Sequence, residues 1–239
     1  MVQRRLRDKA TRAVHIAGMR FTLFALAFAA APCAAQTIED EQVWLNLTVA
    51  GRATGKVLYM LDIQPRFGDG ASRLDTLIAR PAIGWQLTPR LSAYQGYAYV
   101  LNPVDSGRDR REHRSFQQLF WLVRPGETEV LTRFRLEQRW PTAGQDTGWR
   151  LRGLARAETP LGRRSRVKAL GWVEGFAHLN TTDWGARKGF DQLRLFAGIE
   201  VPVQGRTTLE AGYLNQLIND PGGRSRMRHA ASLTLFVRP

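Results

Sequence analysis

Apolar and polar side chains alternate with a period of two along most of this chain. The pattern is clearest in residues 133–140, RFRLEQRW, where Phe, Leu, Gln and Trp alternate with Arg, Arg, Glu and Arg. This period places the two sets of side chains on opposite faces of a β-strand. A soluble sandwich can accommodate one such strand, but a chain that repeats the pattern needs room for many inward charges. A transmembrane barrel offers that room, because lipid surrounds it and its lumen is polar.

Eleven segments of this kind follow one another, each closed by Gly, Pro, Asn or Asp. They cover residues 43–49, 56–67, 73–86, 90–101, 112–124, 127–140, 148–157, 166–179, 190–202, 206–217 and 227–237. The connections alternate between short ones, at 88–89, 125–126, 159–165 and 203–205, and long ones, at 102–111, 141–147, 180–189 and 218–226. The sequence therefore predicts an all-β fold, an antiparallel up-and-down transmembrane β-barrel with short periplasmic turns and long external loops.

The expected strand number depends on where the segment boundaries are drawn. Bacterial single-chain barrels normally have an even number of strands, and eleven is odd. We therefore expect about 10–12 strands and favour twelve, with a boundary misplaced near Thr37 or within residues 56–86. If residues 43–49 are not a full strand, the barrel has ten.

The first 35 residues are typical of a signal peptide. Six basic residues precede an apolar run at 21–31, and Cys33-Ala34-Ala35 follows it. The run is shorter than the roughly 20 residues that a spanning helix needs. We expect cleavage after Ala35, which leaves residues 36–239 as one barrel domain. The alternatives are an uncleaved anchor and a lipidated Cys33, which Pro32 disfavours.

The charge balance narrows the class of partner. The formal net charge is +14, and the leader contributes six basic residues and one acidic residue, which leaves about +9 for residues 36–239. Arginines spread over nearly every segment of an exported chain do not form the basic face of a nucleic-acid-binding module, so no nucleic-acid partner is expected. The expected partners are outer-membrane lipid, phosphorylated lipopolysaccharide and the barrel-assembly machinery, and the oligomeric state stays open.

The motifs predict no cofactor and no metal. The chain has no glycine-rich phosphate loop and no G-x-S-x-G elbow. Its four histidines, His15, His113, His178 and His229, lie too far apart in the sequence to suggest a metal-ligand spacing.

The inward face is expected to carry a set of charged side chains that line the lumen. The set is Glu112, Arg114, Arg133, Arg135, Glu137, Arg139, Arg150, Arg152, Glu174 and Arg194. A narrow barrel is usually filled by its own side chains, so the favoured interpretation is that these charges pair and plug the lumen. The alternative is a selective pore or a ligand cavity for anions.

The turn at 124–127, Arg-Pro-Gly-Glu, predicts how the two segments beside it pair. Its Pro and Gly suit the second and third positions of a type II turn. That turn pairs Arg114 with Glu137 and Glu112 with Arg139. Opposite charges directly across such a ladder contribute roughly 0.2–1 kcal/mol per pair.

Short motifs within residues 40–237 add a family resemblance. They are EHRSFQQ at 112–118, RFRLEQRW at 133–140, WRLR at 149–152, EGF at 174–176, FDQLR at 190–194 and GYLNQ at 212–216. Together they resemble the domain-of-unknown-function 2490 family of exported bacterial proteins, which implies an outer-membrane barrel and no particular activity. The chain departs from the usual barrel terminus, an aromatic last residue, because Val237-Arg238-Pro239 follows Phe236.

One pair of residues could carry chemistry. His113 and Ser115 are two apart, so they share a strand face, and we expect that face to meet lipid near the outer rim. The pair resembles the His-x-Ser arrangement of outer-membrane phospholipase A and the lipid A deacylase, in which histidine takes the proton of the attacking serine. In the predicted pairing Gln138 lies opposite His113, and its amide cannot stabilise an imidazolium as a carboxylate does.

The favoured interpretation is a non-enzymatic outer-membrane protein with a basic, salt-bridged lumen that acts as a small channel, an envelope-structure protein or a surface-binding protein. The first alternative is an outer-membrane acyl hydrolase that uses His113 and Ser115 on phospholipid or lipid A. The second is a soluble periplasmic β-barrel that binds a ligand.

Overall fold

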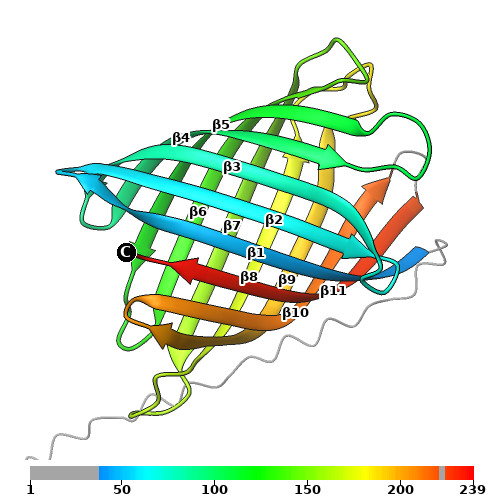
Figure 1. Cartoon of the computed structure of the whole chain (residues 1–239). Coiled ribbons are helices and arrows are strands. Elements are labelled where there is room, and N and C mark those ends of the chain that lie inside the picture. Colours follow the sequence, from blue (N-terminus) through cyan, green and yellow to red (C-terminus); the bar gives the residue numbers. More distant parts are fainter. Residues whose placement is uncertain (1–37, 221–223) are drawn as a thin grey trace, which may run out of the picture. The chain divides into compact units, whose positions relative to one another are not determined.

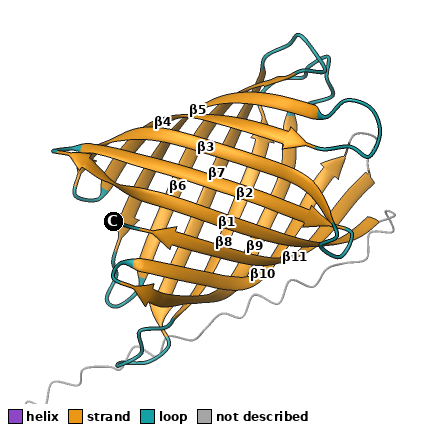
Figure 2. Cartoon of the chain, viewed as in Figure 1, coloured by secondary structure: helices purple, strands orange, loops and turns teal. Residues whose placement is uncertain are grey.

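Eleven β-strands form one closed barrel in the computed structural model, which describes residues 38–220 and 224–239 (Figure 1). The strands are β1 (Ile38–Thr54), β2 (Val57–Gly68), β3 (Arg73–Thr88), β4 (Leu91–Asn102), β5 (Arg110–Val123), β6 (Glu129–Pro141), β7 (Gly148–Pro160), β8 (Lys168–His178), β9 (Gly189–Gln204), β10 (Thr207–Asp220) and β11 (Arg224–Val237). Strands and loops make up the described chain (Figure 2). Within it, no helix is long and apolar enough to cross a membrane. The expected signal peptide, residues 1–35, lies outside the described residues.

The barrel closes through a parallel pair. Each strand pairs in antiparallel fashion with its neighbours in sequence, and β1 runs parallel to β11, with Ile38 opposite Arg226 and Val49 opposite Val237. An odd number of strands that alternate up and down leaves the first and last pointing the same way, so the closing pair must be parallel. The expected all-β barrel of about 10–12 strands is confirmed, and the preference for an even number, twelve, is wrong.

The two ends of the barrel differ in their connections. One end carries the connections 55–56, 89–90, 124–128, 161–167 and 205–206 and the end of β11, and we call it the turn end. The opposite end carries 69–72, 103–109, 142–147 and 179–188 and the start of β1, and we call it the loop end. Because the strand number is odd, the first residue of β1 and the last residue of β11 lie at opposite ends.

The alternating pattern separates an apolar outer face from a charged inner one. Exposed large apolar side chains come from all eleven strands, and they include Leu47, Leu61, Ile83, Tyr97, Leu119, Phe134, Leu151, Val173, Leu195, Tyr213 and Leu233. The positions between them turn inward, where a buried apolar cluster of Trp44, Leu170, Phe196, Leu214 and Ala230 covers part of the inner wall. The period of two read from the sequence therefore assigns the faces correctly.

The pairing of β5 with β6 differs from the expectation by two residues. Arg114 lies opposite Arg139 and Phe116 lies opposite Glu137. The shift arises because the connection holds five residues, 124–128, and the Arg124 side chain pairs with Glu129 at 2.7 Å rather than with Glu127. A shift of two keeps every side chain on its expected face, whereas a shift of one would have reversed them all.

Glycines in β9 and β10 let an aromatic ring lie flat on the inner wall. Gly198 and Gly212 pair directly, and the Phe196 ring lies over both. A Cβ added to Gly198 would come within 2.3 Å of the Ala211 carbonyl oxygen, and neither that backbone atom nor the ladder around it can move freely. By contrast, a Cβ added to Gly153 in β7 would meet open space.

We expect Gly198→Ala to destabilise the barrel by about 1–3 kcal/mol, because the methyl group overpacks a wall that has no space for it. Urea-induced unfolding of the protein in lipid or detergent measures this cost. Gly153→Ala is the matched control, since it adds the same methyl group to a strand glycine, and its unfolding midpoint should change little. Equal midpoints for both variants would contradict the tight packing of β9 against β10.

Candidate functional site in the barrel lumen

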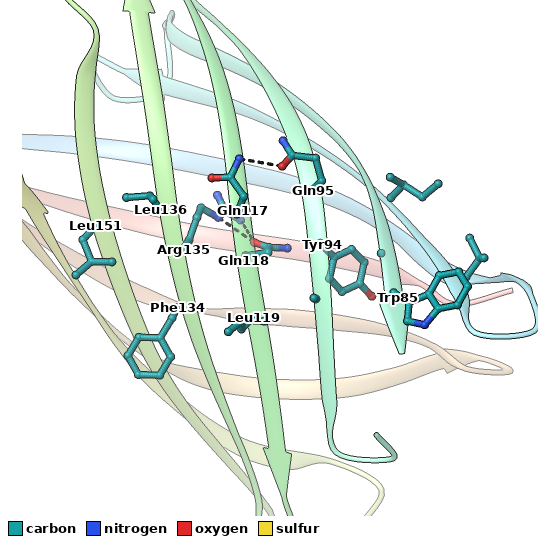
Figure 3. Close-up of a pocket in the computed structure, with 14 residues that line it drawn as sticks. Trp85, Tyr94, Gln95, Gln117, Gln118, Leu119, Phe134, Arg135, Leu136 and Leu151 are labelled. Carbon is teal, nitrogen blue, oxygen red and sulfur yellow. Dashed lines mark hydrogen bonds between the residues drawn. The ribbon is translucent and has the colours of Figure 1, made fainter. Parts of the chain in front are cut away.

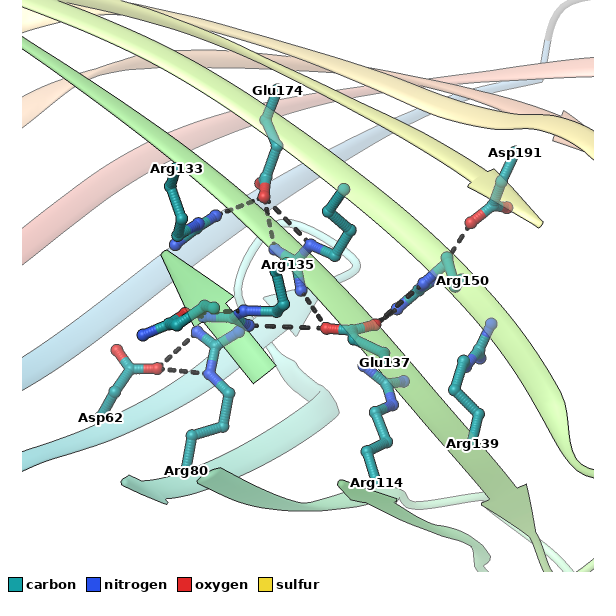
Figure 4. A network of polar contacts seen from close by, with 12 residues as sticks. Asp62, Arg80, Arg114, Arg133, Arg135, Glu137, Arg139, Arg150, Glu174 and Asp191 are labelled. Atoms are coloured by element: carbon teal, nitrogen blue, oxygen red, sulfur yellow. Dashed lines mark hydrogen bonds and ion pairs between the residues drawn. The ribbon is translucent and has the colours of Figure 1, made fainter. Parts of the chain in front are cut away.

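All ten charged residues expected in the lumen lie on the inner face. They come from β5 (Glu112, Arg114), β6 (Arg133, Arg135, Glu137, Arg139), β7 (Arg150, Arg152), β8 (Glu174) and β9 (Arg194). Strand alternation turns each of them inward, and their side chains join in one polar network, part of which Figure 4 draws. The candidate site is therefore the lumen itself.

Glu137 is the centre of this network. Its side chain is 2 % exposed, and its two oxygens accept hydrogen bonds from Arg150 and Arg152, each at 2.7 Å, while Arg135 lies at 3.5 Å (Figure 4). Arg150 sits directly opposite Glu137 in the ladder between β6 and β7. One carboxylate thus holds three guanidinium groups, because in a confined lumen each cation needs a nearby anion.

Glu174 is a second centre and connects strands that do not pair. It accepts hydrogen bonds from Arg152 at 2.7 Å and from Arg133, and Arg194 lies 4.0 Å away. These arginines belong to β7, β6 and β9. The contact of Arg133 with Glu174 passes over β7, so it exists only because the closed wall curves.

A chain of ion pairs continues from Glu137 toward the loop end. Arg150 pairs with Asp191 at 3.0 Å, and Asp191 lies 3.5 Å from His178. Arg139 approaches the same His178 at 3.5 Å and pairs with Glu112 at 2.6 Å. The expected pair of Glu112 and Arg139 therefore exists as a diagonal contact, although Pro141 lies directly opposite Glu112.

Two loops cover this end of the network. The Asp183 carboxylate accepts hydrogen bonds from the backbone N–H groups of Gln145 and Asp146, and these bonds lower the pKa of Asp183 below its usual value. The Trp184 ring packs against Gly148 and lies over Arg139 at 5.1 Å. The loops 142–147 and 179–188 are thereby held to each other above the inward-facing arginines.

Side chains fill the half of the lumen nearer the loop end. Phe116 and Glu137 are among the largest fully buried side chains, and Arg150 and Phe176 are at most 4 % exposed. Arginine side chains stack on the aromatic ones, with Arg135 over Phe116 at 4.3 Å and Arg152 over Phe176 at 4.4 Å. Side chains that line a water-filled channel would be accessible to solvent, so this half is a plug.

The half nearer the turn end holds a cavity of about 520 Å³. Its lining includes the turn and terminal residues Arg124, Arg206 and Arg238, so it reaches that end of the barrel. Eleven basic and six acidic residues line it, which gives a net charge of +5. The arrangement is a blind, positively charged cavity with the plug as its floor.

A cluster of carboxylates and cations stands within this cavity. Arg156 pairs with Glu158 at 2.6 Å and with Glu210 at 2.5 Å, and Lys168 pairs with Glu158 at 2.5 Å and with Glu200 at 3.1 Å. Because Arg156 belongs to β7 and Glu210 to β10, the contact crosses the lumen. Within the described residues, no group of three or more His, Cys, Asp or Glu side chains is arranged to hold a metal ion.

Several lumen residues were not among those expected from the sequence. Arg80 donates a hydrogen bond to Asp62 at 2.6 Å, and Arg66 stacks on the indole of Trp44 at 3.7 Å. The alternation of side chains in segments 56–67 and 73–86 indicates that Asp62, Arg66 and Arg80 face inward. Phe236, which departs from the usual position of the terminal aromatic, also lines the cavity.

A hollow of about 670 Å³ lies on the outer wall across β2 to β7 (Figure 3). Its apolar border includes Ile83, Trp85, Leu119, Phe134 and Leu151. Beside it, the outward amides of Gln95, Gln117 and Gln138 form a hydrogen-bonded row, with Gln117 and Gln95 at 2.8 Å and Gln138 and Gln117 at 3.0 Å. The polar groups on this apolar face thus satisfy one another.

The structure places His113 and Ser115 on the outer face, each in a separate hydrogen bond. Ser115 accepts from the Gln95 amide at 2.9 Å, and His113 Nδ1 shares a hydrogen bond with the Tyr97 hydroxyl. The expected position of Gln138 is wrong, because the two-residue shift puts Gln138 opposite Ser115 and Trp140 opposite His113. Among the described residues, no carboxylate is paired with the imidazole of His113, whereas His178 lies beside Asp191.

Comparison with known proteins gives a family and no activity. The family described as "Protein of unknown function (DUF2490)" matches residues 41–228. An uncharacterized protein of Methylorubrum extorquens is 45% identical over 212 residues, which cover 87% of this chain and 92% of that protein. The family match at 41–228 covers nearly all of the barrel and includes every residue of the Glu137 and Glu174 networks.

We expect Glu137→Leu to destabilise the barrel by about 3–5 kcal/mol, because it leaves Arg135, Arg150 and Arg152 without their shared carboxylate in a buried site. Unfolding by urea in lipid or detergent measures the loss. Glu127→Leu, in the exposed turn before β6, is the matched control and should leave the free energy of unfolding nearly unchanged. If both variants unfold at the same urea concentration, Glu137 does not hold the network together.

Proposed function

We propose that this chain, a member of the DUF2490 family, is a non-enzymatic outer-membrane β-barrel that binds a ligand or supports the envelope and does not act as an open channel. The observation that carries the proposal is the combination of an apolar outer face contributed by every strand with a lumen plugged by ion pairs. The apolar outer face suits a lipid environment. The plugged lumen blocks a path through the barrel.

The outer face supports a membrane location. A ring of exposed apolar side chains around all eleven strands is far larger than the apolar patches that monomeric soluble proteins expose. Exposed tryptophans lie toward both ends, with Trp85 and Trp121 near the turn end and Trp140 and Trp149 near the loop end. Aromatic side chains at both edges of an apolar band are typical of outer-membrane barrels.

The plug argues against a wide pore. Glu137, Arg135 and Phe116 are buried at mid-lumen, and the ion pairs that hold them also fix the wall. With short turns in the periplasm, as is usual for such barrels, the blind cavity faces the periplasm and the interlocked loops face outward. The non-enzymatic assignment is supported by the separate hydrogen bonds of His113 and Ser115 on the lipid-facing wall.

We expect the protein to be recovered with outer membranes and to migrate differently on gels before and after heating. Leu119→Arg should reduce the folded fraction in lipid, because an arginine on the lipid face near mid-height costs about 2–4 kcal/mol. Leu161→Arg is the control, since Leu161 is also exposed but lies in a turn outside the apolar band. Recovery of the wild type in the osmotic-shock fraction, or equal effects of the two substitutions, would contradict a membrane location.

We also expect the purified protein to show no steady ionic conductance in planar lipid bilayers at neutral pH, because the buried network leaves no continuous aqueous path. A general porin of known conductance, reconstituted in the same bilayer, serves as the control. A stable single-channel conductance from the wild type would contradict a plugged lumen and would favour a selective pore.

A further inference from the structure

We propose that the lumen cavity binds an amphipathic organic anion, with its carboxylate or phosphate group on a cluster of arginines at the cavity floor and its apolar body against an aromatic wall. The arginine cluster comprises Arg66, Arg80, Arg133, Arg135, Arg152 and Arg194, all of which line the cavity. The inference rests on the ligand-binding role proposed above and adds the site and the chemical class of ligand.

The charge balance of the arginine cluster requires an anion. Its six guanidinium groups are served by three carboxylates, Asp62, Glu137 and Glu174, which leaves three positive charges in excess. Glu137 is moreover shared with Arg150 outside the cluster. Cations held close together away from bulk water repel one another strongly, so a bound anion would stabilise the site.

Arg66 and Arg133 have donor atoms free for such an anion. Among the described residues Arg66 has no carboxylate partner, and one of its terminal nitrogens donates to the Gln64 amide oxygen at 2.9 Å. The Nε–H groups of Arg66 and Arg133 are buried and have no hydrogen-bond acceptor in the part of the chain that the structure describes. A buried unpaired donor is costly, and residues that line a cavity can satisfy it through a ligand.

Arg66 and Arg194 converge on one aromatic ring. Their guanidinium carbons lie 3.7 and 5.0 Å from the centre of the Trp44 indole, although Arg194 comes from β9 and Arg66 from β2. Stacking on the indole holds the planar groups in place without using their N–H donors. The two donors are thus preorganised for the paired hydrogen bonds that guanidinium groups form with carboxylates and phosphates.

Next to the arginine cluster, part of the cavity lining is apolar. Trp172 and Phe196 are stacked with ring centres 5.4 Å apart, Leu214 lies directly opposite Phe196, and Phe236 lies nearer the turn end. A pocket of about 520 Å³ with a few convergent polar groups and an apolar wall has the size and composition of a site for a small organic ligand. A free inorganic ion would leave the aromatic wall unused, so the ligand needs an apolar body.

Isothermal titration calorimetry on the full-length mature protein in a neutral maltoside detergent tests the proposal with four probes: hexanoate, hexyl phosphate, hexanol and inorganic phosphate. We expect at least one of the two hexyl anions to bind about tenfold or more tightly than hexanol and inorganic phosphate. Only a hexyl anion can contact both the arginine cluster and the aromatic wall. The anion that binds more tightly identifies the head group. Equal affinities for hexanol and both hexyl anions would overturn the proposal.

Substitutions locate the binding. Arg66→Gln combined with Arg133→Gln should weaken anion binding about tenfold or more and leave hexanol binding unchanged. Arg163→Gln combined with Arg164→Gln is the matched control, because it removes two charges from the exposed turn 161–167 at the same end of the barrel. Unchanged anion affinity in the first variant, or an equal loss in the second, would overturn the assignment.

If the double substitution does not fold, a single conservative substitution of a cavity tryptophan still tests the site. The bromine of 6-bromohexanoate quenches indole fluorescence on contact, so the anion should quench the wild type strongly. Trp172→Phe should lose much of this quenching, whereas Trp121→Phe, which changes an outward indole, should retain it. Equal quenching in both variants would overturn the proposal.

Failure of this site and failure of the membrane assignment give different results. A protein recovered with outer membranes that shows no preference for the hexyl anions would disprove the site alone. A protein recovered in the osmotic-shock fraction that binds them through Arg66 and Arg133 would disprove the location alone.

Discussion

The rest of the structure depends on buried carboxylates that hold arginines from different strands. Glu137 joins β6 to β7, and Glu174 joins β6, β7 and β9, so the wall is tied across the lumen as well as along its ladders. A cation at these positions is tolerable only with its anion in contact, because these side chains are largely removed from bulk water. This part of the inner wall is therefore specified by charge pairing.

The same network divides the lumen into two parts with different properties. On its loop side, arginines stack on Phe116 and Phe176 and leave the side chains inaccessible to solvent. On its turn side, cations outnumber carboxylates and a cavity remains. Arg135 and Arg152 belong to both parts, since each contacts Glu137 and also lines the cavity. The network that fills the middle of the lumen thus also forms the floor of the proposed anion site.

The differences between expectation and structure have simple geometric causes. The preference for twelve strands was wrong because it rested on the even number usual for bacterial barrels, and the sequence alone does not reveal that β1 lies beside β11 in parallel. The pairing of β5 with β6 was misjudged by two residues because the connection holds five residues, 124–128, and not the tight turn expected at 124–127, so Arg124 meets Glu129 and not Glu127. Gln138 consequently lies opposite Ser115, and the outward row of amides with Gln95 and Gln117 could not be foreseen.

The sequence by itself determined the fold class and the face that each side chain occupies, because a strand has a period of two and that period survives an even shift in pairing. It therefore assigned Arg133, Arg135 and Glu137 to the lumen and Phe134 to the outer wall. Only the tertiary structure decided which charges meet. Arg156 reaches Glu210, and Arg194 reaches Trp44, across a lumen whose curvature brings together strands far apart in the sequence. Such contacts depend on how the barrel closes. No local sequence pattern encodes the distance between side chains on strands that lie far apart in the sequence.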